Sequence, residues 1–541
     1  MLLAKMRKLF SFLKSAETNF FSENTFFARC VLLAFFILFF FLTRVPGLNR
    51  DVINPDGVNW HYRTQQFIVA LKFQQFENTY QHYHPGVTVM WLTGIPIELY
   101  KQVTNIKVYD VHNFESFDFI AKFSLVVAQL VLSLLIVYVL SKVVGFYKAF
   151  FTLAFFTFEP FFVGNSRLYH LDAVLTLFMF LGLIFAFINL KKTTIWNSLL
   201  AGLFLALAFL TKSIAIGAIP FVVFYSAVYF LSKKEYKKFF FYSGFTVLFF
   251  ALFTFLFFPA LWVKPIYYLS FIFSEAARVG IRKGHGQIIF DEYTRDAGFW
   301  FYPLVFLVKS TPFILFGALA GLVASFRNLK SFIKSSREKL ANFGLYILVF
   351  YFGYVVFMSY PAKKLDRYML VVYPLLAYLA VVGYKKIWES RKKLIDKIVF
   401  WVSIVLFAIV FWIVPFVKIY PYYFTYTSPI VGSSQDANKI IAQKSFGVGI
   451  NALKAFIVKN YSTYELPKLG FLDTKPMKAI YANSRVFDIR VYGPSQYDLL
   501  VLGVNEELPE DILNSKFNFE KDSSIWINGL EYWRIYVKTI K

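Results

Sequence analysis

Long apolar stretches alternate with short polar ones over most of the chain. Two of them, residues 30–42 and 241–262, contain no charged residue. A helix of about 20 apolar residues is long enough to cross the hydrocarbon layer of a membrane, which is roughly 30 Å thick. The pattern predicts about eleven spanning helices, near residues 26–43, 120–141, 148–164, 171–190, 196–212, 214–231, 241–262, 301–323, 341–358, 368–384 and 398–416.

The composition supports a multi-pass membrane protein. Of the 541 residues, 58% are hydrophobic, 16% are charged and 70 are Phe, whereas soluble domains contain about 45–50% apolar residues. The single cysteine, Cys30, excludes an internal disulfide framework. A signal peptide in residues 1–47 is an alternative, but no small-residue cleavage site follows Leu42, so we expect an uncleaved first helix.

The positive charge predicts the orientation in the membrane. The formal net charge is +25, with 57 Lys and Arg against 32 Asp and Glu. Such an excess could indicate nucleic-acid binding, but in a membrane protein basic residues hold short loops on the cytoplasmic side. With the N-terminus inside, all six predicted cytoplasmic segments are basic: 1–14, 141–148, 191–194, 232–240, 326–340 and 384–397. We therefore expect a protein of the cytoplasmic membrane with an extracytoplasmic C-terminal segment.

On this topology the outer side carries two long loops, residues 44–119 and 263–300. Residues 60–73 and 85–100 of the first loop are apolar but too short to span. They predict helices that lie in the membrane interface, with Pro85 at the start of the second. These loops and the short outer turns are the places where an extracytoplasmic site could form.

A change of composition after residue 416 divides the chain into two predicted domains. Residues 1–416 form the polytopic membrane domain, and residues 417–541 form a small extracytoplasmic α/β domain. The second domain has a helical pattern over 435–461 and strand-like runs at 468–473, 485–492, 497–504 and 525–537. The predicted fold class is thus mainly α, with interfacial helices in the first outer loop.

Two acidic residues on the outer side are candidates for catalysis. Asp172 lies where a spanning helix enters the membrane, a position at which a carboxylate needs partners, and Arg167 and His170 are the nearest in sequence. The alternative is a structural ion pair. Asp56 lies in Asn-Pro-Asp-Gly, which is also a common turn, but it shares the outer face with Asp172.

Basic residues on the same face predict an anionic ligand. The outer turn at 359–367 contains Lys363, Lys364 and Arg367, and Tyr368 follows directly. The second outer loop carries Arg278, Arg282, Lys283 and His285. Arginine binds phosphate through two parallel hydrogen bonds. The alternative is an ordinary solvated basic loop. No glycine-rich phosphate loop is present, so an anionic lipid fits better than a nucleotide.

Histidines raise the question of a metal. His82, His84, His170 and His285 could join carboxylates in a metal site, but no HxxxH or HExxH spacing is present. We predict no metal-ligating residue, and the sequence firmly implies no cofactor. A bound divalent metal ion is the alternative.

Five segments, in order along the chain, carry a resemblance to a known family. They are PDGVNWHYRTQQFIVAL with HPGVTVMW, NSRLYHLDAVLTLF, LWVKPIYYL with GHGQIIFDEYTRDAGFWFYPLVFLVKSTP, KKLDRYMLVVYP, and YYFTYTSPIVGSSQDANK with GVG. The chain resembles the GT-C-type membrane glycosyltransferases, specifically the dolichyl-phosphate-mannose–protein mannosyltransferase family and its bacterial and archaeal relatives.

The resemblance implies roles for individual residues. Asp56 matches the family's base, but Gly57 replaces the glutamate of the usual Asp-Glu pair, and Asp172 matches the second acidic position. Lys364 and Arg367 match the residues that hold the lipid phosphate. The turn at 447–451 lacks the family's Trp and Glu.

Further residues are assigned to these groups as candidates. Arg282 and Lys283 would help to bind the donor phosphate. We expect a supporting or acceptor-binding role for Arg63, His82, His84, Arg167, His285 and Tyr368.

The implied activity is transfer of a sugar, with mannose or a similar hexose expected, from a polyprenyl-phosphate donor to an acceptor hydroxyl on a protein, lipid or glycan. Inversion at the anomeric carbon and a place in protein glycosylation or the cell envelope are expectations from the family. The alternatives are a flippase for lipid-linked sugars and a polymerase or ligase of lipid-linked glycans. A flippase favours polar residues near mid-membrane and paired broken helices, whereas the acidic residues here gather on the outer face.

Overall fold

The computed structural model describes residues 26–281, 286–327, 340–462, 464–513 and 517–540. Seven helical segments within them are long and apolar enough to cross a membrane. They are α2 (Phe26–Arg44), α5 (Phe114–Val144), α8 (Asp172–Lys191), η2–α10 (Ser213–Leu231), α11 (Tyr236–Phe257), η3–α19 (Asp366–Glu389) and α20–α21 (Leu394–Lys418). The polytopic helical architecture is therefore confirmed.

The other four predicted spans are bent or short. Helices α6 (Phe146–Thr157) and α7 (Pro160–Ser166) form one apolar segment with a bend of 72°. Helices α9 (Ile195–Thr211) and α18 (Phe343–Ser359) are short apolar helices. The prediction of one helix over 301–323 is wrong, because α14 (Phe301–Lys309) ends before Pro312 and α15 (Pro312–Arg327) begins there. A proline disfavours the helical backbone conformation at the residue directly before it.

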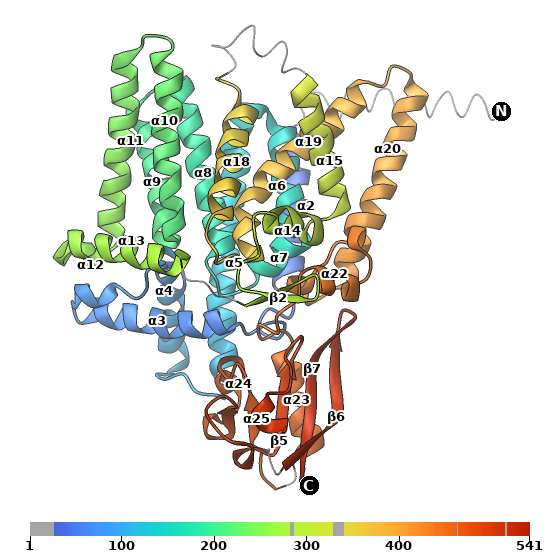
Figure 1. Cartoon of the computed structure of the whole chain (residues 1–541). Coiled ribbons are helices and arrows are strands. Elements are labelled where there is room, and N and C mark those ends of the chain that lie inside the picture. Colours follow the sequence, from blue (N-terminus) through green and yellow to red (C-terminus); the bar gives the residue numbers. More distant parts are fainter. Residues whose placement is uncertain (1–25, 282–285, 328–339, 463, 514–516, 541) are drawn as a thin grey trace.

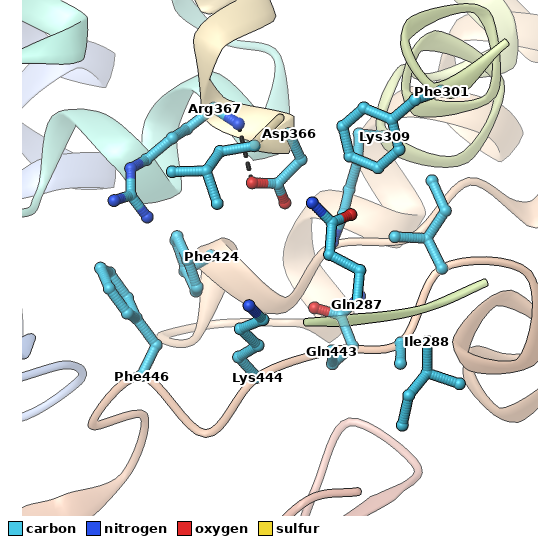
Figure 2. A pocket seen from close by; sticks show the side chains of 13 residues that line it. Gln287, Ile288, Phe301, Lys309, Asp366, Arg367, Phe424, Gln443, Lys444 and Phe446 are labelled. Carbon is cyan, nitrogen blue, oxygen red and sulfur yellow. Dashed lines mark hydrogen bonds between the residues drawn. The ribbon is translucent and has the colours of Figure 1, made fainter. Parts of the chain in front are cut away.

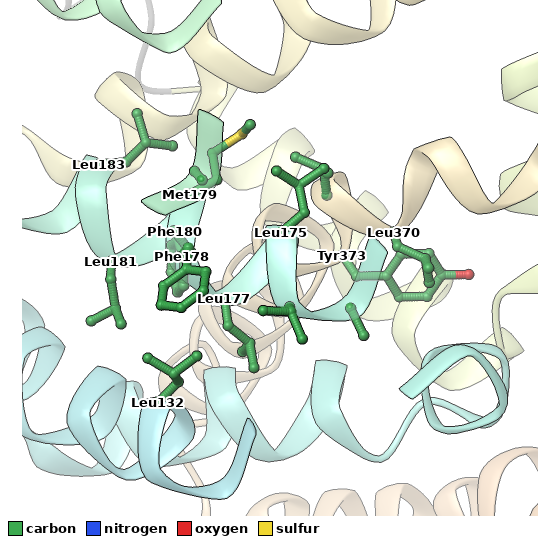
Figure 3. Close-up of a cluster of buried hydrophobic side chains, with 14 of the residues drawn as sticks. Leu132, Leu175, Leu177, Phe178, Met179, Phe180, Leu181, Leu183, Leu370 and Tyr373 are labelled. Atoms are coloured by element: carbon green, nitrogen blue, oxygen red, sulfur yellow. The ribbon is translucent and has the colours of Figure 1, made fainter. Parts of the chain in front are cut away.

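Helix α8 forms the centre of the bundle. Its apolar residues point in every direction, which is typical of a helix surrounded by protein, and the structure buries all but Ile188 and Lys191. Figure 3 shows leucines and phenylalanines of α8 packed with Leu132 of α5 and with Leu370 and Tyr373 at the start of η3–α19. The first residue of this central helix is Asp172, so the hydrophobic core itself fixes the position of that carboxylate.

Helices of the two loops that the predicted topology assigns to the outer side lie across one end of the upright bundle (Figure 1). Helix α3 (Pro55–Lys72) and helix α4 (Val87–Thr104) belong to the first loop, with η1 (Phe76–Thr79) between them. Both predicted helices of this loop are thus present, although α4 begins two residues after Pro85, with Gly86 at φ +62° before it. The second loop contains α12 (Ala260–Val263), α13 (Pro265–Ile281) and the hairpin β1 (Gln287–Ile289) and β2 (Glu292–Thr294).

The C-terminal residues form a five-stranded mixed sheet beyond the same end of the bundle (Figure 1). The strand order is β4 (Val486–Asp488), β3 (Leu469–Phe471), β5 (Leu499–Gly503), β7 (Leu530–Ile540) and β6 (Phe517–Ile527). β3 pairs in parallel with β4 and β5, and the other two pairings are antiparallel. Short helices α24 (Lys475–Ile480) and α25 (Glu510–Leu513) accompany the sheet.

The helix predicted over 435–461 is wrong in its middle. The structure has α22 (Ser434–Ile440) and α23 (Ile450–Tyr461), with an extended segment between them. In that segment Gly447 adopts φ +75°, and a Cβ atom there would lie 1.9 Å from the carbonyl oxygen of Ile53. Only glycine permits so close an approach of two backbones.

This approach attaches the C-terminal domain to the first outer loop. The amide of Ile53 donates to the carbonyl of Gly447 at 3.2 Å, and the amide of Gly449 donates to the carbonyl of Asp51 at 2.7 Å. The Gly-Val-Gly turn that sequence alone left without a role therefore holds the backbone directly before Asp56.

Candidate active site

Asp56 stands in the first turn of α3, directly after the Gly-Val-Gly contact. Pro55 opens the helix, where a missing N–H is no loss. A carboxylate in a first helical turn also interacts favourably with the helix dipole. The Asp56 side chain is 39% exposed, whereas that of Asp172 is 3% exposed. Asp56 is thus the carboxylate of the two that a substrate can reach.

Asp172 is buried at the start of α8 and is held by side chains from other helices. Lys212, which follows α9, places Nζ 2.6 Å from Oδ1 of Asp172. His170 places Nδ1 3.0 Å from Oδ2 of the same carboxylate. Burying a charge requires an opposite charge and hydrogen bonds nearby, and Lys212 supplies the charge.

Arg367 and His170 join the two carboxylates. Nη2 of Arg367 donates to Oδ2 of Asp56 at 2.9 Å, and Nε of Arg367 lies 3.4 Å from Oδ2 of Asp172. The other ring nitrogen of His170, Nε2, lies 3.3 Å from Oδ2 of Asp56. The four residues, together with Lys212, form one continuous cluster, which we call the carboxylate cluster.

The cluster keeps Asp56 ionised. Partial burial on its own raises the pKa of a carboxyl, but the hydrogen bond from His170 and the positive charge of Arg367 outweigh it and hold the pKa of Asp56 well below its ordinary value. The carboxylate is therefore ready to accept a proton at neutral pH. The two carboxylates of the cluster are balanced in charge by Arg367 and Lys212. A phosphate that arrives at the cluster therefore needs further cations.

The 79–91 segment lies beside Asp56, whose charge acts on His82, and we call this segment the wall. His82 contacts Trp60 of α3 with the ring centroids 6.2 Å apart, and Arg63 stacks on the same Trp60 at 4.7 Å. His84 places Nδ1 3.0 Å from Oγ of Ser213. The face of Gly86 is closed by the Trp60 ring, since a Cβ there would lie 2.2 Å from it.

Both histidines of this wall are uncharged at neutral pH. Burial, together with the positive charges of Arg63 and Lys363, lowers the pKa of His82 to about 4. Burial and the charge of Lys212 lower the pKa of His84 well below its usual value. These histidines therefore offer neutral hydrogen-bonding groups, and the cations beside the wall are Arg63 and Lys363.

Tyr368 also lies at the cluster, because Nζ of Lys212 is 4.1 Å from the centre of its ring. Lys364 is buried and does not face the cluster: its Nζ pairs with Asp296 at 2.9 Å and donates to the carbonyl of Pro361 at 2.7 Å. The predicted phosphate ligand Lys364 is thus already occupied in this arrangement.

The expectation that Arg167 pairs with Asp172 is wrong. Nε of Arg167 donates to Asp51 at 2.7 Å. Its other nitrogens donate to the carbonyls of Thr43, Arg44 and Pro46. Arg167 is fully buried, so it fastens the end of α2 and the first outer loop to α7. The predicted residues Arg282, Lys283 and His285 lie outside the described residues.

Gly57, where the resemblance leads one to expect glutamate, is constrained by its surroundings. A Cβ at this position would lie 2.7 Å from Oδ1 of Asn54 and 3.3 Å from the carbonyl oxygen of Tyr169. Asn54 is fully buried. A side chain at this position would therefore require Asn54 to move, and Asp172 is the acidic partner that the fold supplies.

Lys212 is the cluster residue that the sequence analysis missed. It lies between two apolar segments, and the signal available was a lone lysine on the same outer end as Asp172 under the predicted topology. No group of three or more His, Cys, Asp or Glu side chains suited to a metal ion occurs among the described residues. The cluster mixes carboxylates with permanent cations, which is suited to proton transfer beside a bound anion.

The fold is similar to that of ArnT from Cupriavidus metallidurans. The apo state of ArnT aligns with a TM-score of 0.51 at 14% identity, covering 94% of this chain and 97% of ArnT. The form bound to undecaprenyl phosphate aligns with a TM-score of 0.50, also at 14% identity, with the same coverage of both chains. The expected GT-C-type fold is thereby confirmed.

The archaeal oligosaccharyltransferase AglB from Archaeoglobus fulgidus, in complex with an inhibitory peptide and a dolichol-phosphate, aligns with a TM-score of 0.48 at 13% identity over 88% of this chain and 69% of AglB. The sequence matches no protein-family model, and a comparison with curated protein sequences found no match.

Proposed function

We propose that this protein transfers a sugar from a polyprenyl-phosphate donor to an acceptor hydroxyl, with Asp56 as the general base. The observation that carries the proposal is the pairing of a substrate-accessible carboxylate with Arg367, backed by the buried Asp172, at the end of a GT-C-type bundle. ArnT, whose fold this chain shares, has been crystallised with undecaprenyl phosphate. A lipid phosphate at the end of the bundle that carries the carboxylate cluster is consistent with a cation found there, Arg367.

The reaction requires a base and an anion site close together. Asp56 takes the proton of the acceptor hydroxyl as its oxygen attacks the anomeric carbon, and the bond from that carbon to the phosphate oxygen breaks. The departing lipid phosphate gains negative charge, which Arg367 stabilises in the transition state. Arg63 and Lys363 are the further cations near the wall. Displacement in one step inverts the anomeric centre.

Donor binding in this scheme also activates the base. Arg367 lowers the pKa of Asp56 in the free protein. A phosphate that binds the guanidinium of Arg367 weakens the hydrogen bond from Arg367 to Asp56. The pKa of Asp56 then rises, and its carboxylate becomes a stronger base. The buried Asp172 then keeps Arg367 in place, because Arg367 stays paired with it on the other side.

The proposal has three further parts. The transferred sugar is mannose or a similar hexose, the active site is extracytoplasmic, and the N-terminus is cytoplasmic. Their support is the resemblance of the motifs and the basic segments at the predicted cytoplasmic ends of the helices. The acceptor is proposed only as a hydroxyl on a protein, lipid or glycan. Lys364, which pairs with Asp296, would reach a phosphate only after leaving that partner.

The test is sugar transfer in proteoliposomes containing radiolabelled polyprenyl-phosphate mannose and a crude acceptor extract. Asp56→Asn should lower acceptor-dependent transfer by roughly a hundred- to ten-thousand-fold when the activity is normalised to folded protein. Glu507→Gln, at an exposed position of the C-terminal domain, is the control and should keep full activity. Donor movement across the bilayer without transfer, unaffected by Asp56→Asn, would instead support the flippase.

A further inference from the structure

A polar pocket, lined by Arg367 but not by Asp56, lies where three parts of the chain meet. Strand β1 of the second outer loop pairs with the extended segment between α22 and α23: the amide of Ala442 donates to the carbonyl of Ile288 at 3.0 Å. Helix α14 and the start of η3 close the pocket from the membrane domain. Figure 2 shows Lys309, Asp366, Gln287, Gln443 and Lys444 gathered in it, with Phe424 and Phe446 beside Arg367.

Lys309 is a buried lysine, 1% exposed, with no carboxylate within ion-pair distance among the described residues. The negative charge that acts on it is that of Asp366, which lines the same pocket. Its Nζ donates to the carbonyl of Tyr426 at 3.2 Å and lies 5.3 Å from the ring centre of Phe161. A lysine ammonium has three donors, and a buried charge without a counter-charge at ion-pair distance is costly. The pocket therefore offers a strong site for an anion.

Gln443 contributes a second unmet group to the same pocket. The residue is 6% exposed, and within the part of the chain that the structure describes its side-chain Nε2 has no hydrogen-bond partner. Its backbone is satisfied, since the amide donates to Oδ1 of Asn438 at 2.8 Å and the carbonyl accepts from Nδ2 of Asn505 at 2.8 Å. Buried polar groups are nearly always paired, so an unpaired amide donor facing a pocket indicates a missing acceptor atom.

The charges of the side chains that line the pocket indicate which class of ligand it binds. Lys309, Lys444 and Arg367 line the pocket with one acid, Asp366. Asp366 already accepts from the backbone amide of Arg367 at 2.7 Å. The exposed Lys444 is bound only loosely, through the carbonyl of Gly286 at 3.3 Å. Lys309, Lys444 and Gln443 are the hydrogen-bond donors that the lining offers to an oxyanion, and Asp366 is an acceptor for a hydroxyl of the same ligand.

We propose that this pocket binds an oxyanion, a phosphate or carboxylate, carried by a substrate that reaches the carboxylate cluster past Arg367. The oxyanion comes either from the lipid phosphate of the donor or from an acidic group on the transferred sugar or the acceptor. The proposal deepens the proposed function, on which it rests for the identity of the substrates. Lys309 and Gln443 are its main binding groups.

The test measures binding directly and does not need transfer. The melting temperature of the full-length protein in an uncharged detergent is followed as inorganic phosphate replaces sodium chloride at constant ionic strength. We expect a saturable rise for the wild type, and an affinity at least about tenfold weaker for Lys309→Met and for Gln443→Leu. Lys439→Met, at an exposed position of α22 outside the pocket, should bind phosphate like the wild type.

The variants also report whether the protein still folds. Lys309→Met removes an unpaired buried charge with little change of shape, so its melting temperature without phosphate should equal or exceed that of the wild type. No saturable rise in the wild type, or a rise that both pocket variants retain, would overturn the proposal.

Competition distinguishes the two sources. Displacement of phosphate by farnesyl phosphate assigns the pocket to the lipid donor, and displacement by glucuronate but not by farnesyl phosphate assigns it to an acidic sugar. Asp56→Asn separates this proposal from the proposed function. That variant should bind phosphate normally, so normal binding in a wild type that transfers no sugar would refute the transferase and leave the pocket intact.

Discussion

The guanidinium of Arg367 lies 2.9 Å from the carboxylate of Asp56, although the two residues are 311 positions apart in the chain. The contact joins the start of η3–α19 to the first turn of α3 and makes the acid–base state of Asp56 depend on a residue of the bundle. In our proposal the same guanidinium binds the donor phosphate. This contact is therefore the point at which donor binding and base strength are linked.

A pH profile tests the link. Because the pKa of Asp56 is lowered in the free protein, wild-type kcat/KM should show no acidic limb due to Asp56 above about pH 4. Arg367→Met removes a cation that lowers this pKa but leaves the burial that raises it. The pKa then rises, and the acidic limb of the activity profile should move to higher pH than in the wild type.

Arg367→Lys is the matched variant for that profile. It retains a positive charge but not the bidentate geometry, so its acidic limb should lie at lower pH than that of Arg367→Met. Identical profile shapes in all three proteins would contradict the assignment of Asp56 as the base.

The wall histidines should make the fold sensitive to acid. The pKa of His82 is about 4 in the folded protein, lowered by burial and by Arg63, and about 6.5 when unfolded. Between these values the unfolded chain binds the additional proton, so stability is lost as the pH falls from about 6.5 towards 4.

We expect His82→Gln to flatten the decline of the melting temperature between about pH 7 and pH 4.5. His112→Gln, at an exposed position of the same outer loop, is the control and should follow the wild type. An equal slope in His82→Gln and wild type would show that the pKa of His82 is the same in the folded and the unfolded protein.

Arg167 should prove structural. Arg167→Met leaves Asp51 buried without its cation and frees the carbonyls that Arg167 binds. Breaking a buried pair by removing one partner costs about 3–5 kcal/mol. We therefore expect a large fall in melting temperature, with the KM for the donor unchanged once activity is normalised to folded protein. A lower kcat at an unchanged melting temperature would instead give Arg167 a role in the reaction.

A double-mutant cycle tests the Lys212–Asp172 pair. Lys212→Met leaves a buried carboxylate short of its closest cation, and about 3–5 kcal/mol of destabilisation is expected. Lys212→Met combined with Asp172→Leu removes both charges and should be more stable than the sum of the single changes implies, by about 0.5–3 kcal/mol. Melting temperatures of the four proteins give the coupling. Strict additivity would mean that the two side chains do not stabilise each other.

The fold class and the candidate carboxylates could be predicted from the chain alone. Runs such as 241–262 have the length and apolarity that a membrane requires, and hydrocarbon imposes helix on such a run whatever lies beside it. The strands at 469–471, 486–488 and 499–503 were also visible as short apolar runs between turns. Asp172 stood out because a charge among apolar residues is rare enough to need a reason.

The breaks in the elements were less visible. Helices α14 and α15 separate at Ser310 and Thr311, and helices α22 and α23 separate around Gly447. The first break had a local signal in Pro312. The second exists because the backbone of Ile53 approaches within hydrogen-bond distance, and nothing near residue 447 in sequence reports which distant segment will come to it.

The sequence by itself determined that the chain crosses a membrane many times and that Asp56 and Asp172 are acids at helix starts. Only the tertiary structure decided their partners: Arg167 pairs with Asp51 rather than with Asp172, and Lys212 takes that place. The physical reason is that membrane spanning depends on the length and the apolarity of each segment, and both are properties of a continuous stretch of sequence. Ion pairing acts over about 4 Å between side chains, and it depends on the rotation and depth at which separate helices pack.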